Sequence, residues 1–109
     1  MNSKILRPKF APSIIASASV VGKKEHDGPL GSLFDYHDET DKFGSKTWEQ
    51  SEAAMQQLSL NFALSKAKLS PSDLDALFAG DLINQCTSAA YGLLSFDVPY
   101  FGLYGACST

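Results

Sequence analysis

The sequence predicts an α/β fold, because segments typical of strands and of helices alternate along its 109 residues. Three observations lead to this prediction: a β-branched run near the N-terminus, one long helical pattern, and two short apolar runs around a second helical pattern. The order is strand, helix, strand, helix, strand. Such alternation implies right-handed crossovers and a sheet that is mostly parallel.

The first strand is expected over residues 13–21, a run that is β-branched at both ends and is closed by Gly22. A polar stretch follows over residues 23–46, and it contains the turn-forming sequence DGPLG at 27–31. A loop of this length is uncommon inside a compact domain, and such loops are usually functional or flexible.

The first helix is expected over residues 47–68. Thr47 fits the N-cap position and Gln50 the N3 position of a capping box. Apolar residues recur behind this start at helical spacing, namely Trp48, Met55, Leu58 and Phe62. A second start signal at residues 70–73, with serine, proline and an acid in order, predicts one short helical turn.

The second half of the chain should contain two strands and one helix. The apolar segment 75–80 predicts a short buried strand, residues 84–95 predict a helix, and residues 99–104 predict the third strand. The inner face of this helix is expected to carry Cys86, Ala89, Ala90, Leu93 and Leu94.

Two polar residues follow the second and third predicted strands, Asp81 and Cys107. Ligands of open α/β sheets bind beyond the carboxyl ends of the strands, and neighbouring parallel strands bring these turns together. Cys107 sits where a strand-to-helix turn favours the thiolate form. Two structural alternatives stay open: Asp81 as the cap of a helix beginning near Asn84, and Cys107 as a small buried core residue.

Other reactive side chains have simpler interpretations. Cys86 fits a helix core position, Trp48 fits packing, and His26 and His37 fit a solvated surface. The spacing of the acidic group does not match a calcium loop, so it is also interpreted as surface; its members are Asp35, Asp38, Glu39 and Asp41. The sequence contains no Cys-x-x-Cys, His-x-x-x-His or Gly-x-Gly-x-x-Gly pattern, and we therefore expect neither a metal site nor a dinucleotide cofactor.

The net charge of −3 argues against nucleic acid as a partner. No run approaches the length of a membrane-spanning helix, and the first eight residues lack the apolar core of a signal peptide. From these features we expect a cytoplasmic chain that reaches a membrane only through a partner.

Five motifs in fixed order give the chain a family resemblance: DGPLG at 27–31, LFD at 33–35, KTWE at 46–49, AGDLINQ at 79–85 and GACST at 105–109. From about Val20 to the last residue the chain resembles the SpoVAD (stage V sporulation protein AD) family. More broadly, the second half resembles the first part of thiolase-fold condensing enzymes such as ketoacyl-ACP synthase III.

The resemblance implies that residues 1–109 are the N-terminal, incomplete part of a thiolase-like domain. It implies a spore-formation protein that binds dipicolinic acid, usually as the calcium chelate, beside other SpoVA proteins at the spore inner membrane. Cys107 matches the position of the condensing-enzyme nucleophile and Asp81 a polar position beside that pocket, and the ligand-binding candidates are Asp81, Asn84 and Cys107. An uncovered sheet edge should also favour homo-oligomers.

Two alternatives to a binding protein remain. One is an acyltransferase that forms a thioester on Cys107, which requires further residues to activate the thiolate and stabilise the oxyanion. The other is a doubly wound domain without pocket chemistry.

Overall fold

The computed structural model describes residue 5 and residues 7–105. Short strands, helices and single 3-10 turns alternate along this part of the chain. In order they are β1 (Val20–Val21), α1 (Lys23–His26), η1 (Gly31–Leu33), β2 (Tyr36–His37), α2 (Trp48–Ala67), η2 (Pro71–Asp73), β3 (Leu77–Ala79), α3 (Thr87–Leu93), η3 (Leu94–Phe96) and β4 (Tyr100–Gly102).

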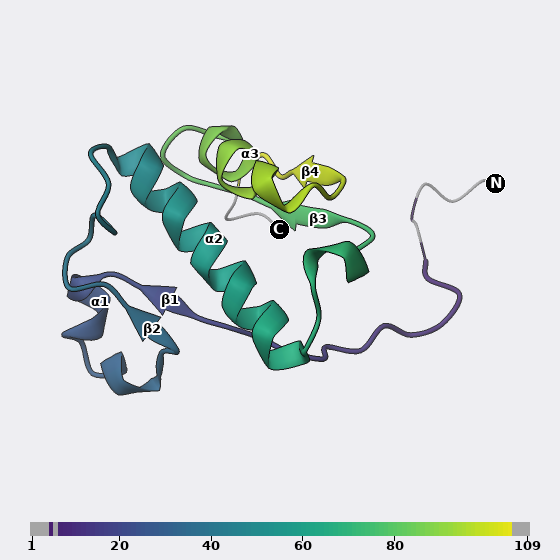
Figure 1. The fold of residues 1–109 in the computed structure, drawn as a ribbon, viewed down its shortest axis with the longest axis horizontal. Helices are drawn as coiled ribbons and strands as arrows, with labels where there is room; N and C mark the ends of the chain where they lie inside the picture. The colour runs from purple at the N-terminus through teal and green to yellow at the C-terminus, as the bar shows by residue number, and fades with distance from the viewer. Residues whose placement is uncertain (1–4, 6, 106–109) are drawn as a thin grey trace.

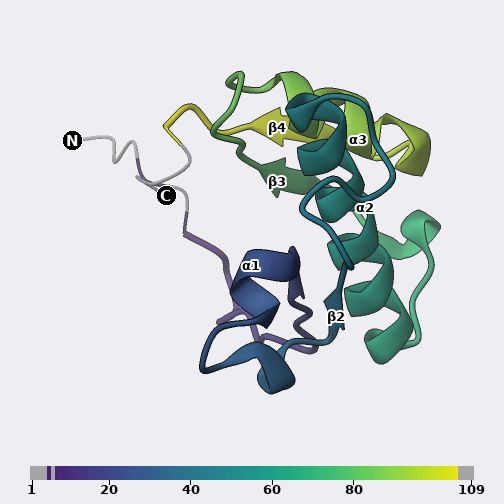
Figure 2. The same ribbon diagram turned by 90° about the vertical axis from the view of Figure 1, so that its left-hand side faces the viewer.

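Helix α2 runs diagonally across the molecule and separates two groups of elements (Figure 1). Strands β1 and β2 lie with α1 on one side, and strands β3 and β4 lie with α3 on the other (Figure 2). Both strand pairs are parallel, with Val20 opposite Tyr36 and Leu77 opposite Tyr100. The predicted α/β class with parallel pairing is therefore confirmed. Within the described residues, however, the strands form two separate two-stranded sheets instead of one.

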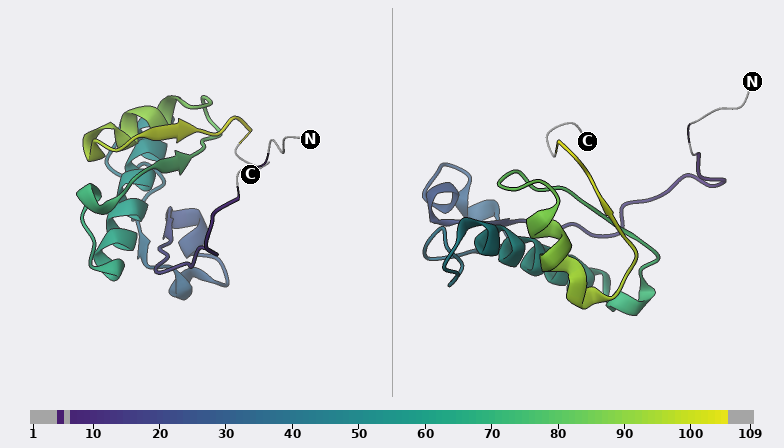
Figure 3. Two further views of the ribbon diagram at one scale, coloured as in Figure 1. Left: turned by 90° about the vertical axis from the view of Figure 1, so that its right-hand side faces the viewer. Right: turned by 90° about the horizontal axis from the view of Figure 1, so that it is seen from above.

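The predicted first strand is much shorter than expected. Only Val20 and Val21 form a ladder, while residues 13–19 lie along the surface without strand pairing, and the side chain of Ile14 is 93% exposed. The extended course of this segment is visible in the right-hand view of Figure 3. β-Branched residues favour a strand only where a neighbouring strand pairs with them, and β2 offers just two residues.

The predicted loop 23–46 contains three short regular elements, α1, η1 and β2. Glycines of this region allow the backbone to fold tightly back on itself. A Cβ atom at Gly31 would collide with the carbonyl oxygen of His26, and one at Gly28 would lie 3.1 Å from the carbonyl oxygen of Glu25. The DGPLG motif is therefore a close-packed corner between α1 and η1.

The long central helix confirms the sequence prediction. The hydroxyl of Thr47 accepts the N–H of Gln50 (3.2 Å), and the side-chain oxygen of Gln50 accepts the N–H of Thr47 (3.3 Å), which completes the capping box. The helix ends where Lys68 adopts a left-handed conformation at the C-cap. The predicted turn at residues 70–73 is η2, which has its own capping box between Ser70 and Asp73.

Helix α3 starts three residues later than predicted, at Thr87, because Cys86 has φ +64° and breaks the helical backbone. The inner face changes accordingly. Ala89 and Leu93 are buried as expected, whereas Ala90 and Leu94 are exposed. The core joins α2, β3 and α3, and its buried members are Leu64, Leu77, Ala89, Leu93 and Phe96.

Within the described residues, no helix combines the length and the apolar character needed to cross a membrane.

Asp35, directly before β2, links the β1–β2 group to α2. Its carboxylate accepts the N–H of Ser19 (2.7 Å) and pairs with the ammonium group of Lys66, which also donates to the carbonyl oxygen of Ser17 (3.0 Å). The hydrogen bond from Lys66 is the main cause that lowers the pKa of Asp35, and the N–H of Ser19 acts in the same direction.

Replacing Lys66 with methionine should lower the melting temperature more near neutral pH than in strong acid, where only the hydrogen bond from Lys66 to the carbonyl oxygen of Ser17 remains to be lost. A carboxyl group whose pKa is lowered on folding stabilises the protein above its ordinary pKa of 3.8, and this contribution is lost as the pH falls through the folded-state value. Thermal unfolding of both proteins at about pH 7 and about pH 2 measures the difference. Lys68→Met is the matched control, and an equal loss in both variants would show that the ion pair does not stabilise the fold.

Candidate functional site

The candidate site lies at the carboxyl ends of β3 and β4, where the chain segments that follow the two strands meet. The N–H of Leu103 donates to the carbonyl oxygen of Ala79 (2.9 Å), and the N–H of Gly105 donates to the side-chain oxygen of Gln85 (3.2 Å). The segments 80–86 and 103–105 are therefore side by side, as parallel pairing of their strands predicts. Cys107 lies outside the described residues.

Asp81 is buried at the centre of this edge, with 2% of its surface exposed. One carboxylate oxygen, Oδ2, accepts the N–H of Ala89 (2.8 Å), which belongs to the first turn of α3. Asp81 thus caps α3 from outside the helix and satisfies an N–H group that has no partner inside it. The other oxygen, Oδ1, is buried and has no hydrogen-bond partner among the described residues.

Two polar side chains of α2 hold the segment after β3 in place. Glu52 Oε2 accepts the N–H of Leu82 (3.1 Å), and Gln56 Nε2 donates to the carbonyl oxygen of Gly80 (3.2 Å). These contacts place Asp81 between two fixed neighbours. Sequence reasoning missed Glu52 and Gln56, although their four-residue spacing indicates a shared helix face.

Tyr100 of β4 contributes a buried hydroxyl close to Cys86. An added Cβ atom at Gly102 would lie 3.0 Å from this hydroxyl and 2.9 Å from Cys86 Sγ, so both groups lie close to one point. Burial is the main cause that raises the pKa of Tyr100, and Cys86 and then Asp81 act in the same direction. The phenol therefore stays a neutral donor, and its oxygen has no partner among the described residues.

Asn84 does not lie with these buried groups. It is exposed, and its carbonyl oxygen accepts the N–H of Thr87 (2.9 Å), which is the contact of a turn residue before a helix. Within residues 7–105, no hydrogen bond joins the side chains of Asn84 and Asp81. The structure therefore brings Cys86 and Tyr100 together, places Asp81 near enough to act on the pKa of Tyr100, and leaves Asn84 exposed.

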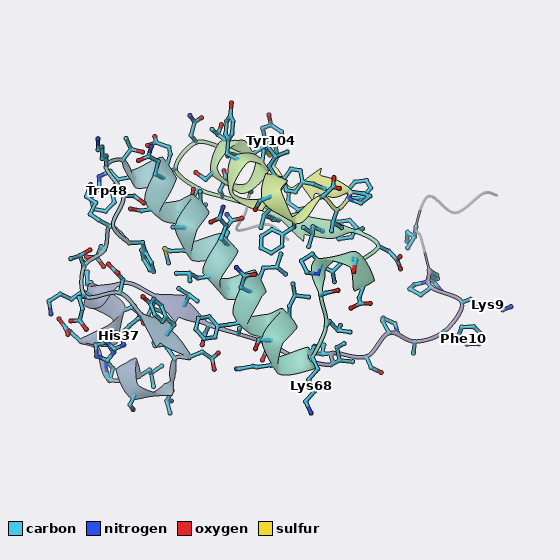
Figure 4. All side chains as sticks on the ribbon, viewed as in Figure 1. Lys9, Phe10, His37, Trp48, Lys68 and Tyr104 are labelled. Carbon is cyan, nitrogen blue, oxygen red and sulfur yellow. The ribbon has the colours of Figure 1, made fainter. Side chains whose placement is uncertain are left out.

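Trp48 is about half exposed, and the ammonium group of Lys42 lies 3.4 Å from the centre of its ring. Trp48 stands at the start of α2 in Figure 4. Two further predictions need correction. His26 and His37 are not solvated separately, because their rings stack on each other. Cys86 is the N-cap of α3 and only half-buried, so it is not a core residue of the helix.

An open apolar groove of about 450 Å³ lies between the two strand pairs, along α2. Its lining comes from β1, α2, β3 and α3, and includes Val20, Met55, Leu60, Leu77 and Leu93. Gln56 reaches from this groove to Gly80 and connects it to the segment that carries Asp81.

In the part of the chain that the structure describes, no group of three or more histidine, cysteine, aspartate or glutamate side chains is arranged to hold a metal ion.

Comparison with known proteins identifies relatives over almost the whole sequence. A family model described as "Stage V sporulation protein AD (SpoVAD)" matches residues 3–109. Stage V sporulation protein AD of Bacillus subtilis (strain 168) is 41% identical over 99 residues, which are 90% of this chain and 29% of that protein. The chain thus spans less than a third of the length of this relative. The chain belongs to the stage V sporulation protein AD family, a family of sporulation proteins.

Proposed function

We propose that the chain is the N-terminal part of a thiolase-like protein of spore formation that binds dipicolinic acid. Family membership supports a role in sporulation, and the resemblance to the thiolase-like SpoVAD proteins supports this ligand. The ligand pocket lies at the carboxyl edge of β3 and β4, and its proposed residues are Asp81, Asn84 and Cys107.

One observation supports this proposal most strongly: Asp81 is buried at that edge and bonds to α3. A buried carboxylate oxygen without a hydrogen-bond partner lowers the stability of a fold. Its presence therefore points to a function or to an additional partner. Its position beyond the carboxyl end of β3 is where open α/β sheets bind ligands.

Dipicolinate carries two carboxylates, so direct contact with Asp81 would bring like charges together. The hydrogen bond to Ala89 suggests a different role. Asp81 acts as a positioning residue that fixes the start of α3 beside the segment after β4. A calcium ion in the chelate would offset the repulsion between Asp81 Oδ1 and the carboxylates of the ligand.

Asp81→Ala should weaken dipicolinate binding by about tenfold or more, because α3 loses a charge-assisted hydrogen bond at its first turn. Asp81→Asn keeps an acceptor oxygen and should bind with intermediate affinity. Titration calorimetry with dipicolinic acid, with and without calcium, on the full-length protein carrying this sequence measures both. Asp75→Asn, at an exposed acid before β3, is the matched control.

The same experiment separates binding from catalysis. Absence of saturable binding in the unsubstituted protein would contradict the proposal and favour the acyltransferase alternative, in which Cys107 forms a thioester. Mass spectrometry after incubation with an acyl thioester would then detect the adduct. Its disappearance in Cys107→Ala would assign the adduct to that residue.

The proposed partners are dipicolinic acid, other SpoVA proteins and further copies of the chain. The last of these is supported by an exposed aromatic pair on β3 and β4, where the rings of Phe78 and Phe101 stack with centroids 5.0 Å apart. Peripheral association with the spore inner membrane, through these partners, is the proposed location.

A further inference from the structure

The segment between β3 and α3 contacts the end of β4 and the chain that follows it through two consecutive side chains. Gln85 Oε1 accepts the N–H of Gly105 (3.2 Å). The thiol of Cys86 lies so close to Gly102 that an added Cβ atom there would be 2.9 Å from Sγ. The stretch 102–105 is therefore contacted at its beginning and at its end by neighbouring residues of one segment.

The backbone of Cys86 explains how two neighbouring side chains can contact the same stretch of chain. In an extended chain, consecutive side chains point to opposite sides. Cys86 has φ +64°, a left-handed conformation that is unfavourable for a residue with a Cβ atom. This conformation breaks the alternation, so the side chains of Gln85 and Cys86 both reach the end of β4 and the chain after it. Strained backbone of this kind is concentrated at functional sites, where surrounding contacts hold it.

The segment that carries Gln85 is itself held by α2. Gln56 Nε2 donates to the carbonyl oxygen of Gly80 (3.2 Å), and Glu52 Oε2 accepts the N–H of Leu82 (3.1 Å). Both contacts join residues that are distant in sequence, so they anchor the segment to the body of the fold. A side chain positions a neighbouring segment precisely when its own base is supported in this way. Gln85 therefore extends from an anchored segment to the chain after β4.

We infer that Gln85 is a positioning residue of the candidate pocket, where it holds Gly105 two residues before Cys107. The left-handed backbone of Cys86 turns Gln85 toward this stretch, and Gly102 makes room for the thiol because it has no side chain. For its effect on ligand binding, the inference rests on the proposed dipicolinate site. The hydrogen bond to Gly105 can be tested without a ligand.

Hydrogen exchange of the full-length protein carrying this sequence tests the contact. Gln85→Leu removes the acceptor, and protection of the Gly105 amide should fall about fivefold, the loss expected for one neutral hydrogen bond. Gln85→Glu keeps an acceptor oxygen and should retain the protection. Gln57→Leu makes the same change on α2 and is the matched control. The amide of Leu103, which donates to Ala79, is the internal reference and should change in none of the variants. Unchanged protection of Gly105 in Gln85→Leu would overturn the inference.

Titration calorimetry with dipicolinic acid and calcium then tests the positioning role. Affinity should be about fivefold weaker in Gln85→Leu than in Gln57→Leu, with similar melting temperatures, because the contact lies at the surface. Equal affinities would overturn the positioning role, and so would a melting temperature of Gln85→Leu well below that of the control, since Gln85 would then act on folding. Absence of binding in the unsubstituted protein would contradict the dipicolinate proposal instead, and exchange at Gly105 would decide the contact by itself.

Discussion

Replacing Gly31 with alanine is expected to lower the stability of the protein by about 3 kcal/mol, near the upper end for overpacked sites. The added Cβ atom would collide with the carbonyl oxygen of His26 and lie 2.7 Å from its carbonyl carbon. Both are backbone atoms, so no side-chain rotation relieves the collision. The connection between α1 and η1 has to open, and with it the stacked pair of His26 and His37.

Thermal unfolding measures the effect of Gly31→Ala as a lower melting temperature. Ser32→Ala is the matched control, since Ser32 is the exposed neighbour in the same 3-10 turn. A melting temperature of Gly31→Ala equal to that of the control would mean that the corner relaxes freely and that the motif is not constrained by packing.

This corner also shows where sequence reasoning reached its limit. The DGPLG motif predicts turns correctly, but the turn chemistry of residues 27–31 does not reveal that the chain returns to pair β2 with β1. That pairing depends on the close contact between the backbone of Gly31 and the carbonyl group of His26. It also depends on the carboxylate of Asp35, which binds Ser19 and Lys66 from distant parts of the sequence. Local patterns carry no information about such contacts.

Prediction worked best where local interactions decide the structure. The start of α2 follows from the capping box at Thr47, which needs only residues close in sequence. Strands β3 and β4 were predicted from short apolar runs, and their parallel pairing from the helical pattern between them. The run 13–21 has equally good strand composition but finds only two paired residues, because a ladder needs a partner as well as propensity.

At the candidate site, Asp81 could be identified as a candidate residue from the sequence, but its hydrogen bond with the N–H of Ala89 could not be predicted. The alternative that Asp81 caps a helix was correct, but the predicted start of that helix near Asn84 was wrong. Helix α3 begins at Thr87, and the N–H that Asp81 accepts belongs to Ala89. The shift results from the left-handed backbone of Cys86, a conformation that cysteine seldom adopts and that no local pattern indicates.

The second large effect is expected for Gly92→Val, at the crossing of α2 and α3. An added Cβ atom at Gly92 would lie 2.9 Å from the carbonyl oxygen of Ala53 and 3.1 Å from its Cβ atom. Valine adds two further methyl groups at a buried position, so α3 must move away from α2, at a cost of about 3 kcal/mol. Thermal unfolding should show this loss, whereas Ala90→Val, at an exposed position of the same helix, should stay close to the unsubstituted protein.

The displacement should also reach the candidate site. Ala89, three residues before Gly92, donates to Asp81, while Glu52, the neighbour of Ala53, holds Leu82. Separating the helices therefore moves the two partners of the segment 80–82 in opposite directions. The proposed binding of dipicolinate, measured on folded Gly92→Val by calorimetry well below its melting temperature, should be weakened along with stability. A variant with reduced stability and unchanged affinity would show that the α2–α3 contact does not position the site.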